Sequence, residues 1–177
     1  MAGELETVLR WAHVLFGITW IGLLYFFNFV QPRLLKAIPD DQKKRVTLAI
    51  LRPGLWFFRY SALGTWLVGA AMLVWLATLG GGALYRSGAL ANIMAGAILG
   101  TFMFLNVWGV IWRYQKRNIA ALEANVNSGT PMPPEAAVWV KRATFASRSN
   151  VIMSFPMLYF MVASPLLHGT GLFGGAL

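Results

Sequence analysis

Two histidines are the side chains in this sequence best suited to bind a metal or cofactor, and one of them lies in a long apolar run. His13 belongs to the stretch Trp11-Ala12-His13-Val14-Leu15-Phe16-Gly17-Ile18-Thr19-Trp20. An ionisable side chain at membrane depth is costly unless it pairs with another group or ligates something. His13 is therefore the first candidate for a functional residue.

Gly17 lies four residues after His13, on the same face of a helix. A glycine there leaves a flat notch beside the imidazole, which a porphyrin ring or a neighbouring helix could fill. One interpretation makes His13 an axial metal ligand. The other makes it an interhelical hydrogen-bond donor, with Gly17 as a packing contact. The residues alone leave both open.

Composition places these residues in a membrane protein. Of the 177 residues, 58% are hydrophobic and only 12% are charged, which is typical of a single transmembrane domain. There is no cysteine, so disulfides, iron–sulfur clusters and covalent haem attachment through C-x-x-C-H are excluded. Any haem must be bound non-covalently, as haem b is.

Four apolar segments are long enough to cross a hydrocarbon core of about 30 Å. They cover about residues 8–30, 55–79, 90–112 and 145–167. The predicted fold is therefore an all-α integral membrane protein, a bundle of four transmembrane helices.

Charge predicts the orientation of this bundle. Twelve of the fifteen lysines and arginines lie in the connecting segments 31–54 and 113–144 or, in the case of Arg148, just beyond them. Short basic loops stay in the cytoplasm. Both termini and the 80–89 turn are then periplasmic, in a bacterial inner membrane. The net charge of +9 is explained by topology and does not indicate nucleic acid.

The basic segments contain helix signals of their own. Pro39-Asp40-Asp41 predicts a helix start and Arg52-Pro53-Gly54 a stop, which gives a short surface helix or, alternatively, a solvated charged loop. In the second segment, residues 118–125 prolong the third helix. The stretch 128–134 breaks it, and a new helix begins at Glu135.

The predicted topology places both histidines on the outer side of the membrane. His13 is near the outer start of the first span, and His168 is at the outer end of the fourth. If these helices are neighbours, His13 and His168 could be the axial ligands of one haem b. Met157 or Met161 could replace His168, although methionines in apolar helices usually fill the core. The alternative for His168 is a hydrated terminal residue.

Other polar residues and glycines are expected to mediate helix packing. Gly64, Gly69 and the Gly96-x-x-x-Gly100 motif provide small faces for close helix approach. A polar cluster, made by interhelical hydrogen bonds and snorkelling, is expected at the inner end from Asn28, Arg59, Asn106 and Asn150.

Three blocks of the sequence resemble the membrane domain of PuuD-type urate hydroxylases, the urate oxidase N-terminal family. They are the stretch from Arg10-Trp11-Ala12-His13 to Trp20-Ile21-Gly22, residues 106–116, and the stretch from Ser147-Arg148-Ser149-Asn150 to Ser154-Phe155-Pro156-Met157. The resemblance implies a haem-linked membrane scaffold that oxidises a substrate and passes electrons towards the respiratory chain, with His13 as the matching position.

A second, weaker resemblance is to HemJ-type protoporphyrinogen oxidases, which are small four-helix haem proteins. It rests on His13, on Trp20 seven residues later, and on Pro32-Arg33-Leu34. Both resemblances imply a role for the same histidine in haem binding.

The sequence therefore predicts a b-type haem protein in electron transfer, with His13 and His168 as metal ligands and Gly17 beside the ring. One alternative is a cofactor-free accessory subunit of a larger respiratory or photosynthetic complex. Another is an oxidase that acts on a porphyrin or purine at His13, so whether the chain is an enzyme stays open. The expected partners are the lipid bilayer and either other membrane subunits or a second copy of the chain.

Overall fold

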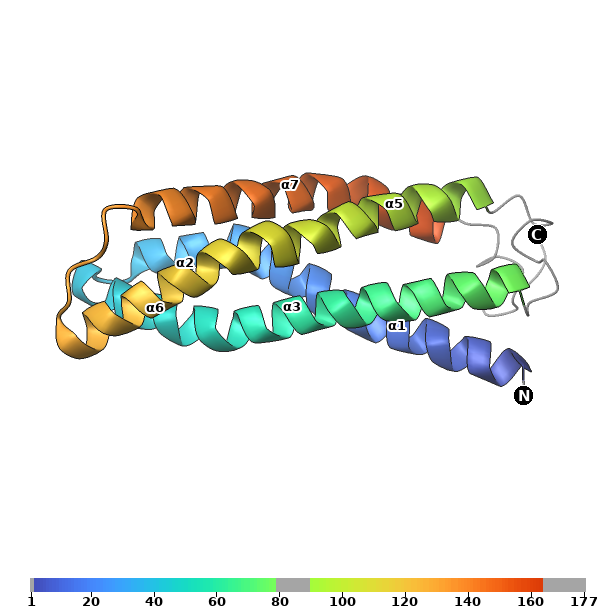
Figure 1. Cartoon of the computed structure of the whole chain (residues 1–177), viewed down its shortest axis with the longest axis horizontal. Helices are drawn as coiled ribbons and strands as arrows, with labels where there is room; N and C mark the ends of the chain where they lie inside the picture. The colour runs from blue at the N-terminus through green and yellow to red at the C-terminus, as the bar shows by residue number, and fades with distance from the viewer. Residues whose placement is uncertain (1, 79–89, 164–177) are drawn as a thin grey trace.

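The computed structural model describes residues 2–78 and 90–163, which are helical with short links and contain no strand. Figure 1 shows long helical rods side by side. The elements, in order, are α1 (Ala2–Tyr25), the π-helical turn η1 (Phe26–Val30), α2 (Gln31–Ala37), α3 (Asp40–Thr78), α5 (Leu90–Asn106), the π-helical turn η2 (Val107–Ile111), α6 (Trp112–Ser128) and α7 (Ala136–Val162).

Three of the rods are long and apolar enough to cross a membrane: Gly3–Ala37, Asp40–Thr78 and Leu90–Ser128. The fourth rod, α7, has 27 residues. The last residues of the predicted fourth span lie outside the described residues, as do the predicted 80–89 turn and His168.

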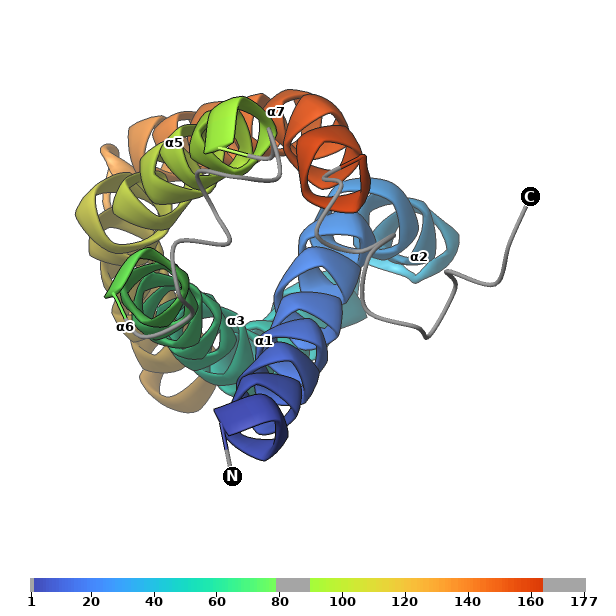
Figure 2. The same cartoon turned by 90° about the vertical axis from the view of Figure 1, so that its right-hand side faces the viewer.

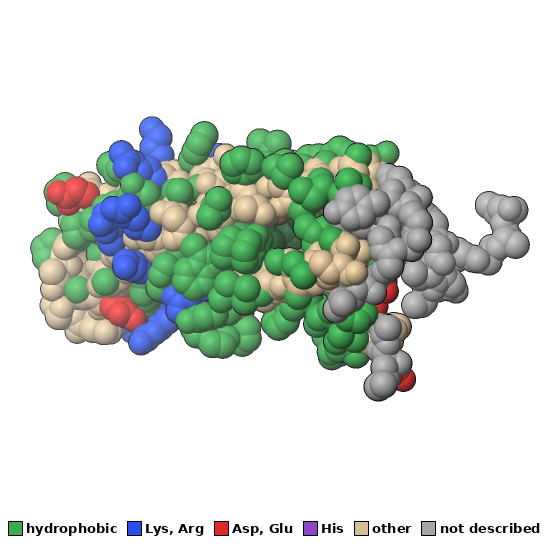
Figure 3. All heavy atoms as spheres, turned by 45° about the vertical axis from the view of Figure 1, so that its right-hand side comes forward, with side chains coloured by type: hydrophobic (Ala, Val, Ile, Leu, Met, Phe, Trp, Pro, Cys, Tyr) green, Lys and Arg blue, Asp and Glu red, His purple; other side chains and the backbone are tan. Residues whose placement is uncertain are grey.

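The outer surface of the rods is apolar, as a lipid-facing surface must be. Large hydrophobic side chains are widely exposed, including Trp11 (63%), Ile18 (65%), Phe145 (75%) and Ile152 (72%). In Figure 3 hydrophobic side chains cover the middle of the molecule, and the lysines and arginines gather towards one end, called the basic end below. Exposed apolar patches of this size are consistent with a bilayer environment.

The rods pack as two pairs, α1 with α3 and α5 with α7. Figure 2 shows the pairs on opposite sides of the bundle when it is seen along its length. Trp66 of α3 connects them, because its ring stacks on Phe104 at 5.2 Å between centroids and its Nε1 donates to Thr101 Oγ1 at 3.1 Å. At the basic end, α6 packs against both α3 and α7.

Side-chain hydrogen bonds between helices form a polar seam through the interior. Asn150 of α7 is fully buried; its Oδ1 accepts from Asn106 Nδ2, and its Nδ2 donates to the Met103 carbonyl, both at 3.0 Å. Two further contacts join α1 and η1 to α7: Tyr25 hydroxyl with Ser154 hydroxyl at 2.9 Å, and Asn28 Nδ2 to Ser147 Oγ at 2.7 Å.

The seam confirms the predicted grouping of Asn106 and Asn150. Asn28 bonds Ser147, which lies three residues before Asn150 on α7. Arg59, the fourth expected member, is not part of it. Its guanidinium lies on the ring of Trp112, with 3.8 Å between Cζ and the ring centroid, on the α6 side of α3.

The predicted surface helix is confirmed at its start and wrong at its end. A helix does begin at Asp40, but it continues through Pro53 and Gly54 as the 39-residue α3. An internal proline costs about 3 kcal/mol, and packing on both sides outweighs that cost. Leu51 and Leu55 are buried, and a Cβ at Gly54 would lie 2.7 Å from Phe27 Cζ. The Pro-Gly pair is therefore a contact point with η1.

The link between α6 and α7 follows the sequence signals. The helix predicted over 118–125 extends to Ser128, and Gly129 ends it with φ of +70°, a left-handed conformation that favours glycine. The Gly129 N–H donates to the Asn125 carbonyl at 3.1 Å. The next helix begins at Ala136, directly after Glu135.

Replacing Asn150 tests the importance of the polar seam. Asn150→Ala leaves the Asn106 amide and the Met103 carbonyl without their partner, so we expect a loss of about 1 to 2 kcal/mol in unfolding free energy, measured by SDS titration in mixed micelles. Ser149→Ala is the matched control, because the Ser149 hydroxyl bonds only the Phe145 carbonyl of its own helix. Equal stabilities of the two variants would contradict a structural role for the seam.

Candidate functional site

The imidazole of His13 lies in the contact between α1 and α3, directly on Gly69. A Cβ built at Gly69 would be 2.8 Å from His13 Cε1 and 3.1 Å from Nδ1. Real Cβ atoms do not approach other atoms this closely, so the position of the ring depends on the missing side chain. Gly69, which the sequence marked as a packing residue, is the wall of the candidate site.

The Nδ1 atom of His13 is buried and has no hydrogen-bond partner. The backbone of Thr65, one turn before Gly69, is a hydrogen-bonding group for the ring. A buried polar atom without a partner costs free energy comparable to a lost hydrogen bond. A ligand that binds to this atom is one explanation for the missing partner.

Trp20 adds a second unpaired nitrogen to the same helix face. It lies seven residues after His13, its side chain is 2% exposed, and its Nε1 has no partner either. Two ring nitrogens on one face of α1, His13 Nδ1 and Trp20 Nε1, are thus buried without a partner, whereas the seam residues nearer the basic end are paired.

Gly17 is placed differently from Gly69. A Cβ at Gly17 would lie 3.9 Å from Thr65 Cγ2, which is an ordinary packing distance. This distance fits a packing contact between α1 and α3, and a role of Gly17 beside a cofactor stays a prediction. The glycine in contact with the imidazole comes from α3.

The second predicted ligand, His168, lies outside the described residues. Met161 packs on α5, where its Cε is 3.0 Å from a Cβ built at Gly96, and Met157 is a core residue of α7. In Figures 1 and 2 the N-terminal half of α1 follows α3 and stays apart from α7, and the helices meet at Tyr25.

The described residues contain no group of three or more His, Cys, Asp or Glu that could hold a metal ion. Within residues 2–78 and 90–163 there is one imidazole, that of His13. It has a buried unpaired nitrogen and lies on Gly69. One histidine can supply one ligand to a haem iron, and haem binding at His13 stays a prediction.

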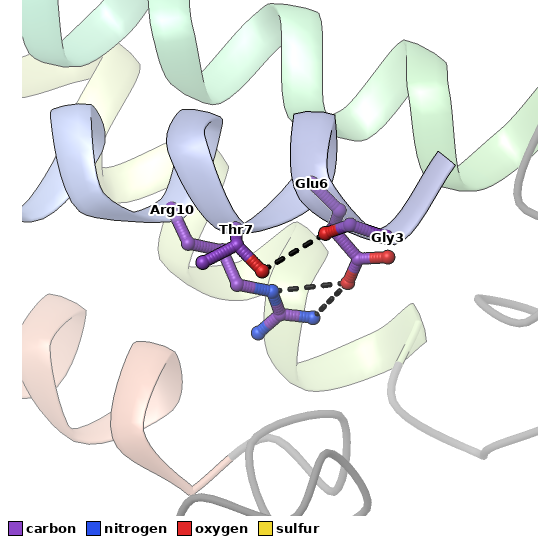
Figure 4. Close-up of polar contacts among 4 residues, drawn as sticks. All are labelled: Gly3, Glu6, Thr7 and Arg10. Atoms are coloured by element: carbon purple, nitrogen blue, oxygen red, sulfur yellow. Dashed lines mark hydrogen bonds and ion pairs between the residues drawn. The ribbon is translucent and has the colours of Figure 1, made fainter. Parts of the chain in front are cut away.

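Arg10, one turn before His13, is neutralised within α1. Its Nε and Nη2 donate to Glu6 Oε1 at 3.0 and 2.6 Å, and Thr7 Oγ1 bonds the Gly3 carbonyl at 2.9 Å, as Figure 4 shows. The cation next to His13 is thereby paired within its own helix.

A small polar cavity that sequence reasoning missed lies in the half of the bundle nearer the basic end. Its volume is about 90 Å³, room for about three water molecules. Its polar lining comes from separate helices and is uncharged: Asn28, Gln31, Gln115, Thr144 and Ser147. Asn28 and Gln31, and likewise Thr144 and Ser147, are three residues apart on one rod, but no sequence spacing brings these two pairs and Gln115 together.

Comparison with known proteins adds no relative: no family model, curated protein or solved structure matches this chain. The similarity to urate hydroxylase membrane domains and to HemJ-type oxidases therefore stays a hypothesis from sequence.

The contact between His13 and Gly69 can be tested without any ligand. Gly69→Ala forces the imidazole to move, so we expect a loss of about 1 to 3 kcal/mol in unfolding free energy. Adding His13→Ala to the Gly69→Ala chain should remove most of that loss. Gly100→Ala is the control, because nothing lies within 4 Å of a Cβ there. Additive losses in the double variant would contradict the contact.

Proposed function

We propose that this chain is a four-helix protein of the bacterial inner membrane that holds haem b at His13 and takes part in electron transfer. The observation that carries the proposal is the buried, unpaired Nδ1 of His13 against Gly69. The two distant resemblances to haem membrane proteins match at the same histidine.

The proposed topology has the basic end in the cytoplasm and both termini in the periplasm. It is supported by the cations gathered at one end of the bundle in Figure 3 and by the positive-inside rule. In this arrangement α7 is the fourth span, and the haem lies in the outer half of the membrane.

His13 would hold the iron through one ring nitrogen, and the backbone near Thr65 would accept a hydrogen bond from the other. Ligating histidines are commonly fixed in this way. Gly69 would keep α3 flat beside the ring, and Trp20 would be a polar contact on the same face. The haem itself would supply reversible one-electron chemistry. The chain would supply an apolar surrounding and fix the ligand's orientation.

The second axial ligand is proposed to be His168. A haem held by His13 alone is the alternative, because Met161 packs on α5 and Met157 is buried in the core. The two cases differ in spin state, so they can be told apart spectroscopically.

The proposal is tested by a reduced-minus-oxidised visible spectrum of the chain purified in detergent from cells supplied with haem. We expect a b-type α-band, lost in His13→Ala because the iron loses its ligand. Thr19→Ala is the matched control on α1, since the Thr19 hydroxyl is exposed and bonds only the Leu15 carbonyl. His168→Ala should keep the haem and change its spin state.

A colourless chain at good yield would overturn the proposal. If that chain co-purified with a larger respiratory or photosynthetic complex, the accessory-subunit alternative would replace it. Oxidation of an added porphyrin or purine, lost in His13→Ala, would instead assign an oxidase.

A further inference from the structure

A groove between α3 and α6 at the basic end gathers cations and tryptophans. Its volume is about 290 Å³, about ten times the volume of one water molecule in the liquid. We call it the basic groove and define it by its polar and aromatic lining, Arg52, Trp56, Arg59, Trp112, Lys116 and Glu123.

The basic groove carries an excess of positive charge. Arg52 Nη1 and Glu123 Oε1 form an ion pair at 2.9 Å. No other carboxylate lines the groove, and no carboxylate of the described residues pairs with Arg59 or Lys116. Two cations therefore remain uncompensated, which favours an anionic ligand.

Aromatic rings hold Arg59 in place. Its guanidinium carbon lies 3.8 Å from the centroid of the Trp112 ring and 4.7 Å from that of Tyr60. Its Nε is buried without a hydrogen-bond partner. A guanidinium fixed by stacking loses little entropy when it binds a phosphate through two N–H groups.

The surroundings of the groove favour a lipid over a free anion. Trp56 is 51% exposed, and the neighbouring Phe57 and Tyr60 are 55% and 40% exposed. These side chains lie on α3 next to the cations, where the apolar band meets the basic end. A ligand with both a phosphate and acyl chains would use both kinds of surface.

We propose that the basic groove binds the headgroup of an anionic phospholipid in the leaflet at the basic end. Arg59 and Lys116 contact the phosphate, and the acyl chains lie along Trp56 and Phe57. The Arg52–Glu123 pair closes the groove on the side towards the end of the bundle. This inference is independent of the haem proposal.

The test is native mass spectrometry of the full chain in detergent with equal amounts of phosphatidylglycerol and phosphatidylcholine. We expect selective retention of phosphatidylglycerol and a loss of about five- to tenfold in its apparent affinity in Arg59→Gln. Arg33→Gln is the matched control, since Arg33 is an exposed cation on α2 that does not line the groove. It should leave retention unchanged.

Inorganic phosphate at millimolar concentration distinguishes a lipid site from a free-anion site. We expect it to leave the bound phosphatidylglycerol in place. Displacement by phosphate, equal losses in Arg59→Gln and Arg33→Gln, or no preference over phosphatidylcholine would each overturn the proposal. If Arg59→Gln fails to fold, Lys116→Gln answers the same question, because Lys116 is exposed and stacks on no ring.

Discussion

The structure depends on one constraint: a polar atom inside a membrane bundle must find its partner within the protein. The polar seam meets it between helices. Asn150 bonds both Asn106 and a backbone carbonyl. Asn28, within η1, donates to the Leu24 carbonyl as well as to Ser147. Such paired polar groups fix the register of the helices, which apolar contacts in a lipid solvent specify poorly.

Two of the exceptions to this pairing lie at the candidate sites. His13 Nδ1 and Arg59 Nε are both buried without partners, although they belong to different surroundings. The imidazole lies on a glycine between two apolar helices, and haem is the ligand proposed there. The guanidinium lies on aromatic rings at a charged border, and a phospholipid headgroup is the ligand proposed there.

Signals that act over a few residues were sufficient for much of the fold. Apolar length predicted the long helices, Asp40 predicted a helix start, and Gly129 a helix end. Prediction from sequence failed where contacts with a distant helix determine the structure. Pro53 is a helix-stop signal, yet α3 continues through it because Gly54 packs against η1. Likewise, the glycine next to His13 by spacing is on its own helix, whereas the contacting Gly69 is on α3 and no local pattern pairs them.

The continuity of α3 has a mechanical consequence. At 1.5 Å per residue its 39 residues extend about 58 Å, roughly twice the hydrocarbon thickness. Pro53 removes one backbone hydrogen bond, so the helix bends most easily there. Arg59 and Gly69 both follow Pro53, about 15 Å apart along the axis. The proposed lipid groove and the wall of the imidazole are therefore joined by one stretch of helix that no proline interrupts.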